Sequence, residues 1–300
     1  MQGPLNELSW AESARRLETW GYSTLFVPDH FHQGLGPITA MATAAVATTT
    51  LNVGSMVFAG DFRHPAVLAR ELATIDILSE GRLEIGLGAG YDALDYSRSG
   101  IPMDSATVRV DRLIEHATVL KALFANGPVT FAGDHYTITD LEGTPKPFRV
   151  GGPPIIIAGG GPRILGFAAT SADIVGINPS IKAGVVDIDS AQDALPSRID
   201  QKVAWVREAA GGRYADIEFT AWLAVAEITD HAAAKAERLS VRFAAPPQEV
   251  LQSPIVLVGT EAEIVDRLEE RRERWGYSYF VIQGPKAEKF APLVARLTGA

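Results

Sequence analysis

Short hydrophobic runs alternate along the chain with longer segments in which apolar residues recur every three or four positions. Most of the short runs are apolar at consecutive positions, which is typical of strands buried on both faces of a parallel sheet. The longer segments have the period of amphipathic helices. The pattern predicts seven strands, at residues 23–28, 51–58, 82–88, 154–159, 173–177, 219–226 and 278–282.

Several segments between these runs carry helix signals. The segment 65–81 starts with proline and ends with glycine, as helices prefer. Thr260 is followed three residues later by Glu263, a capping box that predicts the start of a helix. Residues 8–17 and 106–124 also repeat apolar positions at helical spacing.

Residues 129–138 follow a different pattern, because polar and apolar positions alternate around Gly133 and Asp134. They predict a β-hairpin inserted in a loop, at residues 128–140. The strand–helix units predict an α/β fold, a (β/α)8 TIM barrel that forms one domain over residues 1–300. The pattern has seven strands and the barrel needs eight, so we expect the first strand to be missing at the N-terminus. Either this strand lies upstream of Met1 or another element closes the barrel, and the sequence leaves both possibilities open.

The composition excludes several classes of protein. The chain has 300 residues, 47% of them hydrophobic, which is enough for a large core. It has no cysteine, so disulfides, thiolate metal sites and cysteine nucleophiles are excluded. The net charge of −9 and the lack of a basic cluster argue against nucleic acid or an anionic membrane surface as a partner. Without a membrane-spanning stretch or a signal-peptide pattern, we expect a cytoplasmic protein.

The candidate functional residues follow the predicted strands, where a TIM barrel carries its active site. Asp29 and His30 come directly after the first run, in the sequence VPDHFH. Such a titratable pair is either a capping detail or a catalytic group, and spacing alone favours a structural role. The later candidates are Ser55, Met56 and Phe58, then Gly88, Ala89, Gly90 and Tyr91, then Ala158, Gly159, Gly160 and Gly161, and finally Asn178.

Two of these segments are rich in glycine. In AGGGPR, residues 158–163, a helix is predicted to start near Pro162, and its first amides could bind a phosphate. A tight turn that needs small residues explains the same sequence, and both interpretations stay open. In GLGAG, residues 86–90, the glycines superficially match a dinucleotide-binding pattern, but the other parts of a Rossmann unit are lacking. We interpret this segment as backbone that passes close to a flat ligand.

The HFH sequence, residues 30–32, raises a metal site as an alternative, because a His-x-His pair can ligate zinc. Further ligands would have to come from later strand ends. The remaining histidines offer no second imidazole at such a position, so no metal is predicted. The sequence also lacks the Gly-x-Ser-x-Gly elbow of serine hydrolases.

Taken together, these segments resemble the bacterial luciferase-like superfamily, in its branch of oxidoreductases that use the deazaflavin coenzyme F420. The resemblance rests on GYSTLFVPDHF, on the segment from NVGSMVFAGDF to GLGAGYDALDY, and on PPIIIAGGGPRILGFAATSADIVGIN. It extends from about residue 8 to residue 283. It implies a (β/α)8 barrel with an insertion, a bound deazaflavin, a small-molecule substrate and a homodimer.

The resemblance also implies roles for individual residues. His30 would donate or accept a proton at the reactive edge of the deazaflavin, and Asp29 would orient His30 or bond the ring. A non-prolyl cis peptide is implied at Ser55-Met56, behind the ring. The other cofactor-binding residues would be Phe58, Gly88, Ala89, Gly90 and Tyr91, the phosphate-binding run from Ala158 to Gly161, and Asn178, which would face the substrate pocket.

Two positions depart from the family members that oxidise sugar phosphates. Tyr91 stands where those enzymes have a glutamate, and Ile181, next to Lys182, stands where a lysine is expected. A sugar-phosphate dehydrogenase is therefore not favoured, and the substrate stays open. The alternatives are an FMN-dependent monooxygenase of the same superfamily and a non-catalytic flavin-binding barrel. Positive groups for the acidic tail of F420, at Arg63, His64 or Arg163, would favour F420 over FMN.

Overall fold

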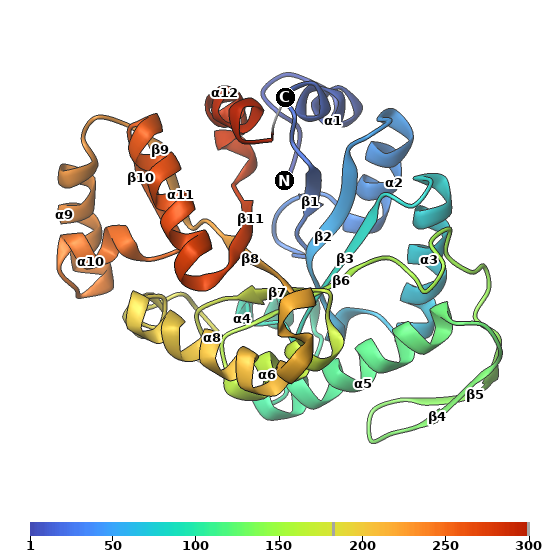
Figure 1. The fold of residues 1–300 in the computed structure, drawn as a ribbon. Coiled ribbons are helices and arrows are strands. Elements are labelled where there is room, and N and C mark those ends of the chain that lie inside the picture. Colours follow the sequence, from blue (N-terminus) through green and yellow to red (C-terminus); the bar gives the residue numbers. More distant parts are fainter. Residues whose placement is uncertain (182–183, 299–300) are drawn as a thin grey trace. The chain divides into compact units, whose positions relative to one another are not determined.

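The computed structural model describes residues 1–181 and 184–298, so Lys182 lies outside the described residues. The chain divides into two compact units, Met1–Ile155 and Ile156–Gly299, whose elements are labelled in Figure 1. Each unit is an α/β structure with parallel strands, and the single domain stays a prediction. None of the described helices has both the length and the apolar character needed to span a bilayer.

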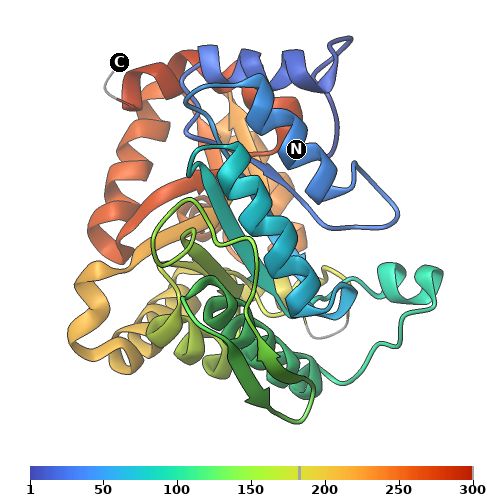
Figure 2. The ribbon, with the colours of Figure 1, turned by 90° about the vertical axis from the view of Figure 1, so that its right-hand side faces the viewer.

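Among the described residues, the first unit has three parallel strands that pair in chain order. β1 (Thr24–Val27) pairs with β2 (Asn52–Ala59), and β2 pairs with β3 (Leu83–Gly88). Because the strands are parallel, their carboxyl ends lie at the same edge. Figure 2 shows two helices of this unit, α2 and α3, side by side. The helices are α1 (Trp10–Thr19), α2 (Pro37–Ala47), η1 (Gly60–Phe62), α3 (Pro65–Leu78), α4 (Ala93–Ser99) and α5 (Ala106–Phe124).

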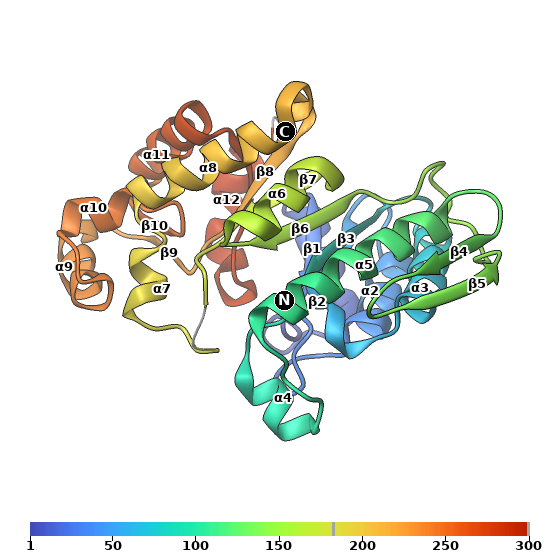
Figure 3. The same cartoon turned by 90° about the horizontal axis from the view of Figure 1, so that it is seen from below.

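The alternating segment of the first unit forms an antiparallel pair. β4 (Val129–Ala132) pairs with β5 (Thr137–Leu141). The pair lies beside α5 (Figure 3).

In the described part of the second unit, four parallel strands pair in the order β6, β7, β8 and β11. Their bounds are Ile155–Gly159, Ile174–Ile177, Glu218–Trp222 and Tyr277–Val281. A separate parallel pair consists of β9 (Val225–Ile228) and β10 (Val256–Gly259). The helices are α6 (Pro162–Ser171), α7 (Ile188–Gln192), α8 (Pro196–Ala210), η2 (Gly211–Asp216), α9 (Ala232–Phe243), α10 (Pro247–Gln252), α11 (Glu261–Trp275), η3 (Gly284–Lys286) and α12 (Ala287–Leu297).

The prediction of one strand at residues 219–226 is wrong, because this run contains two strands. The backbone N–H of Leu223 donates to Val281, whereas that of Val225 donates to Ile255, so the chain changes its pairing partner between them. An apolar run cannot show this change, since both strands are hydrophobic. The sequence reasoning also missed β10, whose signal was the apolar run directly before the capping box at Thr260.

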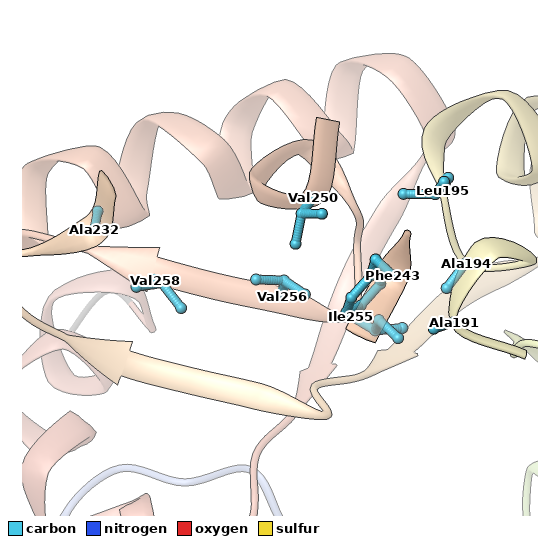
Figure 4. Packing of buried hydrophobic residues seen from close by; sticks show 9 residues of the cluster. All are labelled: Ala191, Ala194, Leu195, Ala232, Phe243, Val250, Ile255, Val256 and Val258. Carbon is cyan, nitrogen blue, oxygen red and sulfur yellow. The ribbon is translucent and has the colours of Figure 1, made fainter. Parts of the chain in front are cut away.

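The strand β10 explains much of the core of the second unit. Val256 and Val258 pack from this strand against side chains of α9 and α10 (Figure 4). The buried cluster contains Ala191, Ala194, Leu195, Ala232, Phe243, Val250, Ile255, Val256 and Val258. Burial of these apolar side chains is the main stabilising contribution to this part of the unit.

Candidate functional site

The carboxyl ends of β1, β2 and β3 bring the predicted residues of the first unit together. Asp29 and His30 follow β1 directly. Asp29 accepts a hydrogen bond from the N–H of Ala59 at the end of β2, with a distance of 3.2 Å. The His30 ring lies edge-on to the ring of Tyr91, which follows β3, with centroids 6.0 Å apart. The three segments therefore form one cluster.

Asp29 pairs with Arg63, and this differs from the expected pairing with His30. Arg63 Nη1 and Nη2 donate to the two carboxylate oxygens of Asp29 at 2.5 and 3.0 Å, a bidentate pair. The pair occupies both oxygens of Asp29. It also commits the charge of Arg63, which weakens the expected role of Arg63 toward the acidic tail of F420.

His30 is oriented instead by Asp95 in the first turn of α4. Its Nδ1 lies 2.6 Å from Asp95 Oδ2. Asp95 is buried. Burial alone would raise the pKa of Asp95, but hydrogen bonds from His30 and from the Phe31 N–H hold it below its usual value. Among the described residues, the His30 Nε2 has no hydrogen-bond partner.

A second histidine shares the same carboxylate. His32 Nδ1 lies 2.9 Å from Asp95 Oδ1, and His32 Nε2 lies 3.5 Å from an oxygen of Asp92. One ring nitrogen or carboxylate oxygen from each of His30, His32, Asp92 and Asp95 can be chosen so that the four atoms lie within 4.8 Å of one another. These two carboxylates were not predicted from the sequence, which was considered only for further histidines at later strand ends. Their signal was two acids three residues apart at a helix start, a spacing that places both on one helix face.

A further set of polar contacts fixes α4 in the first unit. The Tyr96 hydroxyl donates to Asp61 at 2.8 Å, and Arg112 of α5 donates to the other oxygen of Asp61 at 2.6 Å. Arg112 also contacts Asp104. These contacts tie α4 to η1 and α5, and thereby set the position of Asp95.

The predicted residues on β2 are largely engaged within the protein. Ser55 is buried and exchanges hydrogen bonds with the backbone of Gly86. Phe58 is fully buried, and the Arg63 guanidinium lies 5.4 Å from its ring centroid. A non-prolyl cis peptide is present at Met56-Val57, so the implied position at Ser55-Met56 is wrong by one residue. The pairing register of β2 with β3 shifts between Ser55 and Phe58, which the sequence pattern did not show.

The glycines of GLGAG are explained by packing inside the first unit. A Cβ at Gly86 would lie 2.1 Å from the Ser55 carbonyl oxygen, and one at Gly88 would lie 2.6 Å from Val57. Gly90 has a φ of +72°, and a Cβ there would lie 2.0 Å from the Tyr96 hydroxyl. The close approach is therefore to β2 and α4, where the sequence reasoning expected a flat ligand.

Part of this segment remains accessible. Ala89 and Gly90 are partly exposed, and Tyr91 is exposed. Burial of its hydroxyl, together with the charges of Asp92 and Asp95, raises the pKa of Tyr91. Tyr91 is therefore a weaker acid than an ordinary tyrosine.

The glycine run of the second unit contains both kinds of position that the sequence left open. A Cβ at Gly159 would lie 2.4 Å from Ile164, and one at Gly160 would lie 2.5 Å from the Ser180 nitrogen. These two glycines are required by packing. Gly161 has open space around its Cβ position and is the N-cap of α6, with no side-chain cap. Amides at an uncapped helix start can bind an anion. Ala158 precedes this run and is buried.

Asn178 is held by its backbone, close to the same glycine run. Its N–H donates to the Gly159 carbonyl, and its own carbonyl accepts from the Lys202 ammonium, both at 2.9 Å. Lys202 is fully buried and also pairs with Asp193 at 2.6 Å. Among the described residues, the side-chain amide of Asn178 has no hydrogen-bond partner.

Residues 9–188, more than half of the chain, match the family of luciferase-like monooxygenases. The F420-dependent glucose-6-phosphate dehydrogenase of Amycolatopsis mediterranei is 32% identical over 170 residues, which are 54% of this chain and only 50% of that protein. The pyrimidine monooxygenase RutA of a Caulobacter species is 29% identical over 282 residues, 87% of this chain and 77% of that protein.

Among solved structures, the coenzyme F420-dependent tetrahydromethanopterin reductase from Methanopyrus kandleri has a similar fold. The TM-score is 0.76 at 19% identity, and the match covers 96% of this chain and 93% of that one. The family match confirms the predicted resemblance to the luciferase-like family, and the similar structure confirms an α/β fold of the luciferase-like kind.

Proposed function

Because the chain belongs to the luciferase-like monooxygenase family, we propose that it is an oxidoreductase that uses coenzyme F420 and transfers a hydride to or from a small organic substrate. One observation carries this proposal. His30 is held at the end of β1 through its Nδ1, and its Nε2 has no partner among the described residues. A fixed imidazole with a free nitrogen is suited to exchange one proton with a substrate.

Each unit, taken by itself, has residues that could bind a group of the kind found in this cofactor. In the first unit, the ring of Tyr91 lies beside that of His30. The residues that are at least partly exposed and would contact the deazaflavin are Met56, Ala89, Gly90 and Tyr91. Ser55 and Phe58 are buried, so they would support the cofactor-binding residues only through packing. In the second unit, the start of α6 at Gly161 would bind phosphate, and the Asn178 amide would bind a polar group of a ligand.

F420, when bound, would supply two-electron hydride chemistry, while the protein positions the substrate and moves the proton. His30 Nε2 would take the hydroxyl proton of a substrate that is oxidised, or return it in the opposite direction. Asp29, paired with Arg63, would keep the strand end rigid. The relation to the dehydrogenase of Amycolatopsis mediterranei supports F420, although it covers about half of both chains.

The second candidate function is an FMN-dependent monooxygenase. The similarity to RutA favours it, because that match extends over 87% of this chain. Since Arg63 is paired with Asp29, its positive charge no longer favours F420, which has an acidic tail, over FMN. A non-catalytic barrel is the third candidate, and the preserved His30 geometry argues against it.

The test is a titration of the purified protein with F420 and, separately, with FMN, followed by absorbance and tryptophan fluorescence. We expect F420 to bind at about micromolar concentration and FMN to bind more weakly. A panel of alcohols and enones then tests for hydride transfer. His30→Ala should lower kcat about 10²-fold or more, whereas the exposed His231→Ala is the matched control. Preference for FMN would replace the proposal with the monooxygenase, and binding of either cofactor without turnover would leave the non-catalytic barrel.

We also propose that the protein is a closed eight-stranded barrel, with a first strand before α1 and with β4 and β5 as an insertion. We further propose that it is a cytoplasmic homodimer. The net charge of −9 supports the absence of a nucleic-acid partner. Light scattering of the purified protein measures the oligomeric state, and a monomer would contradict the homodimer.

A further inference from the structure

We propose that Asp95 is a positioning residue that fixes His30 in the tautomer with a proton on Nδ1, and that His32 locks Asp95 in place. The functional part of this inference rests on the proposed function, but the tautomer is a property of the protein alone. Asp95 was not among the residues predicted from the sequence, and its role follows from the contacts of the first unit.

Both oxygens of the buried Asp95 carboxylate face hydrogen-bond donors, which hold the carboxylate in one orientation. Oδ1 of Asp95 accepts from the Phe31 N–H at 2.7 Å and lies 2.9 Å from His32 Nδ1. Oδ2 lies 2.6 Å from His30 Nδ1. Rotation of the carboxylate would break contacts on Oδ1, so Oδ2 stays directed at His30. The donors come from three consecutive residues, His30, Phe31 and His32, which lie in the loop that follows β1.

The tautomer follows from the chemistry of the partner. An ionised carboxylate only accepts hydrogen bonds, so the nitrogen that contacts it must carry the proton. Nδ1 of His30 is therefore the donor, and Nε2 of the neutral ring carries the lone pair. When Nε2 removes a hydroxyl proton, the O–H bond breaks and an Nε2–H bond forms. The positive charge of the resulting imidazolium lies next to Asp95, which stabilises it.

The position of the carboxylate is supported from a second direction. Tyr96, the next residue on α4, is bonded to Asp61, which is bonded in turn to Arg112. Among the described residues, Asp92 and Asp95 are the carboxylates that face the two histidine rings, and Tyr91 lies beside His30. Asp92 reaches only His32 Nε2, at 3.5 Å. Asp92 therefore provides a matched control for Asp95.

A divalent metal ion is a different explanation of two histidines and two aspartates within 4.8 Å. The contacts favour hydrogen bonding, because both oxygens of Asp95 and both Nδ1 atoms are already paired at 2.6 to 2.9 Å. A metal ion would have to displace these bonds. Binding of zinc is therefore an outcome that the experiment must detect.

The experiment is long-range ¹H–¹⁵N NMR of the histidine rings in EDTA-treated protein without cofactor. His30→Gln and His32→Gln assign the signals. We expect His30 to show a protonated Nδ1 and an unprotonated Nε2 at pH 8. Asp95→Asn should remove this preference, because an amide can also donate, whereas Asp92→Asn should preserve it. His32→Gln gives a second test if Asp95→Asn does not fold, and should weaken the preference.

Three results would overturn the inference. The first is a wild-type His30 protonated on Nε2, and the second is an unchanged tautomer in Asp95→Asn. The third is a stoichiometric shift of both ring signals by added zinc, which would make the cluster a metal site. In the active enzyme, Asp95→Asn should lower kcat about 10²-fold with little change in KM. If the tautomer is as expected but neither F420 nor FMN supports turnover, the proposed function fails and the positioning role stands.

Discussion

His116 provides a test of the packing in the first unit. It lies on α5, is fully buried, and neither ring nitrogen has a hydrogen-bond partner among the described residues. The ring of Tyr136 lies 5.9 Å from it. Burial, together with the positive charges of His64 and Arg63, lowers the pKa of His116 from 6.5 to about 4. The folded protein therefore keeps this histidine neutral where an exposed histidine would be charged.

The free-energy consequence follows from this difference in pKa. Between pH 6.5 and about pH 4, the unfolded chain binds a proton that the folded chain does not bind. The free energy of unfolding should therefore fall as the pH falls through this window, and level off below it. Each pKa unit corresponds to about 1.4 kcal/mol, so the total loss should be about 3 kcal/mol. Above pH 6.5 the contribution is fully present.

The assay compares His116→Leu with the wild type by urea unfolding at pH 7.5 and pH 4.5. Leucine does not titrate, so the difference in unfolding free energy between the two proteins should shift by about 2–3 kcal/mol in favour of the variant at the lower pH. Any constant packing cost of leucine cancels in this comparison. His231→Leu, at an exposed position, should show no such shift. An equal pH dependence for His116→Leu and wild type would refute the reasoning.

Three further predictions concern other parts of the fold. Oε1 of Glu18 accepts hydrogen bonds from the N–H groups of residues 49–51, and these bonds hold the pKa of Glu18 at about 2 against the opposing effect of burial. Glu18→Gln should therefore lower the unfolding free energy by about 1 kcal/mol at pH 7 after screening by solvent. Urea unfolding should show this difference between variant and wild type fade as the pH falls from 4.5 toward 2. Gly86→Ala should lower the unfolding free energy by about 2 kcal/mol or more through overpacking, while equal melting temperatures for Gly86→Ala and Gly161→Ala would contradict the packing argument. Lys202→Met removes a fully buried ammonium and leaves the partly buried Asp193 with Arg198 as its remaining charged partner among the described residues, so we expect a loss of about 3 kcal/mol in unfolding free energy. The double variant with Asp193→Asn should restore part of this loss, and no restoration would show that the pairing is not the cause.

The sequence pattern was sufficient for features that depend on neighbouring residues. The capping box at Thr260 and Glu263 forms as expected, because both hydrogen bonds lie within one helical turn. The buried strands after Tyr22 and Asp173 also match their apolar runs, since a strand buried on both faces needs hydrophobic residues at every position.

Features that depend on residues far apart in the chain were not predicted. Asp95 meets His30 only because α4 folds back toward the end of β1, 65 positions earlier in the sequence. The partner of Asp29 was missed for the same reason, since Arg63 follows a different strand. The shift in register between β2 and β3 depends on the backbone around Val57, and no periodicity reveals it.

The open space at Gly161 has a practical consequence for studying this protein. The chain contains no cysteine, so Gly161→Cys would create a single thiol. A Cβ at this position would meet no atom within 4 Å beyond its chain neighbours, whereas one at Gly159 or Gly160 would collide with the protein. A small fluorophore attached there would report from the first turn of α6. It would convert the arrival of an anionic ligand at this helix into an optical signal, with the native packing left unchanged.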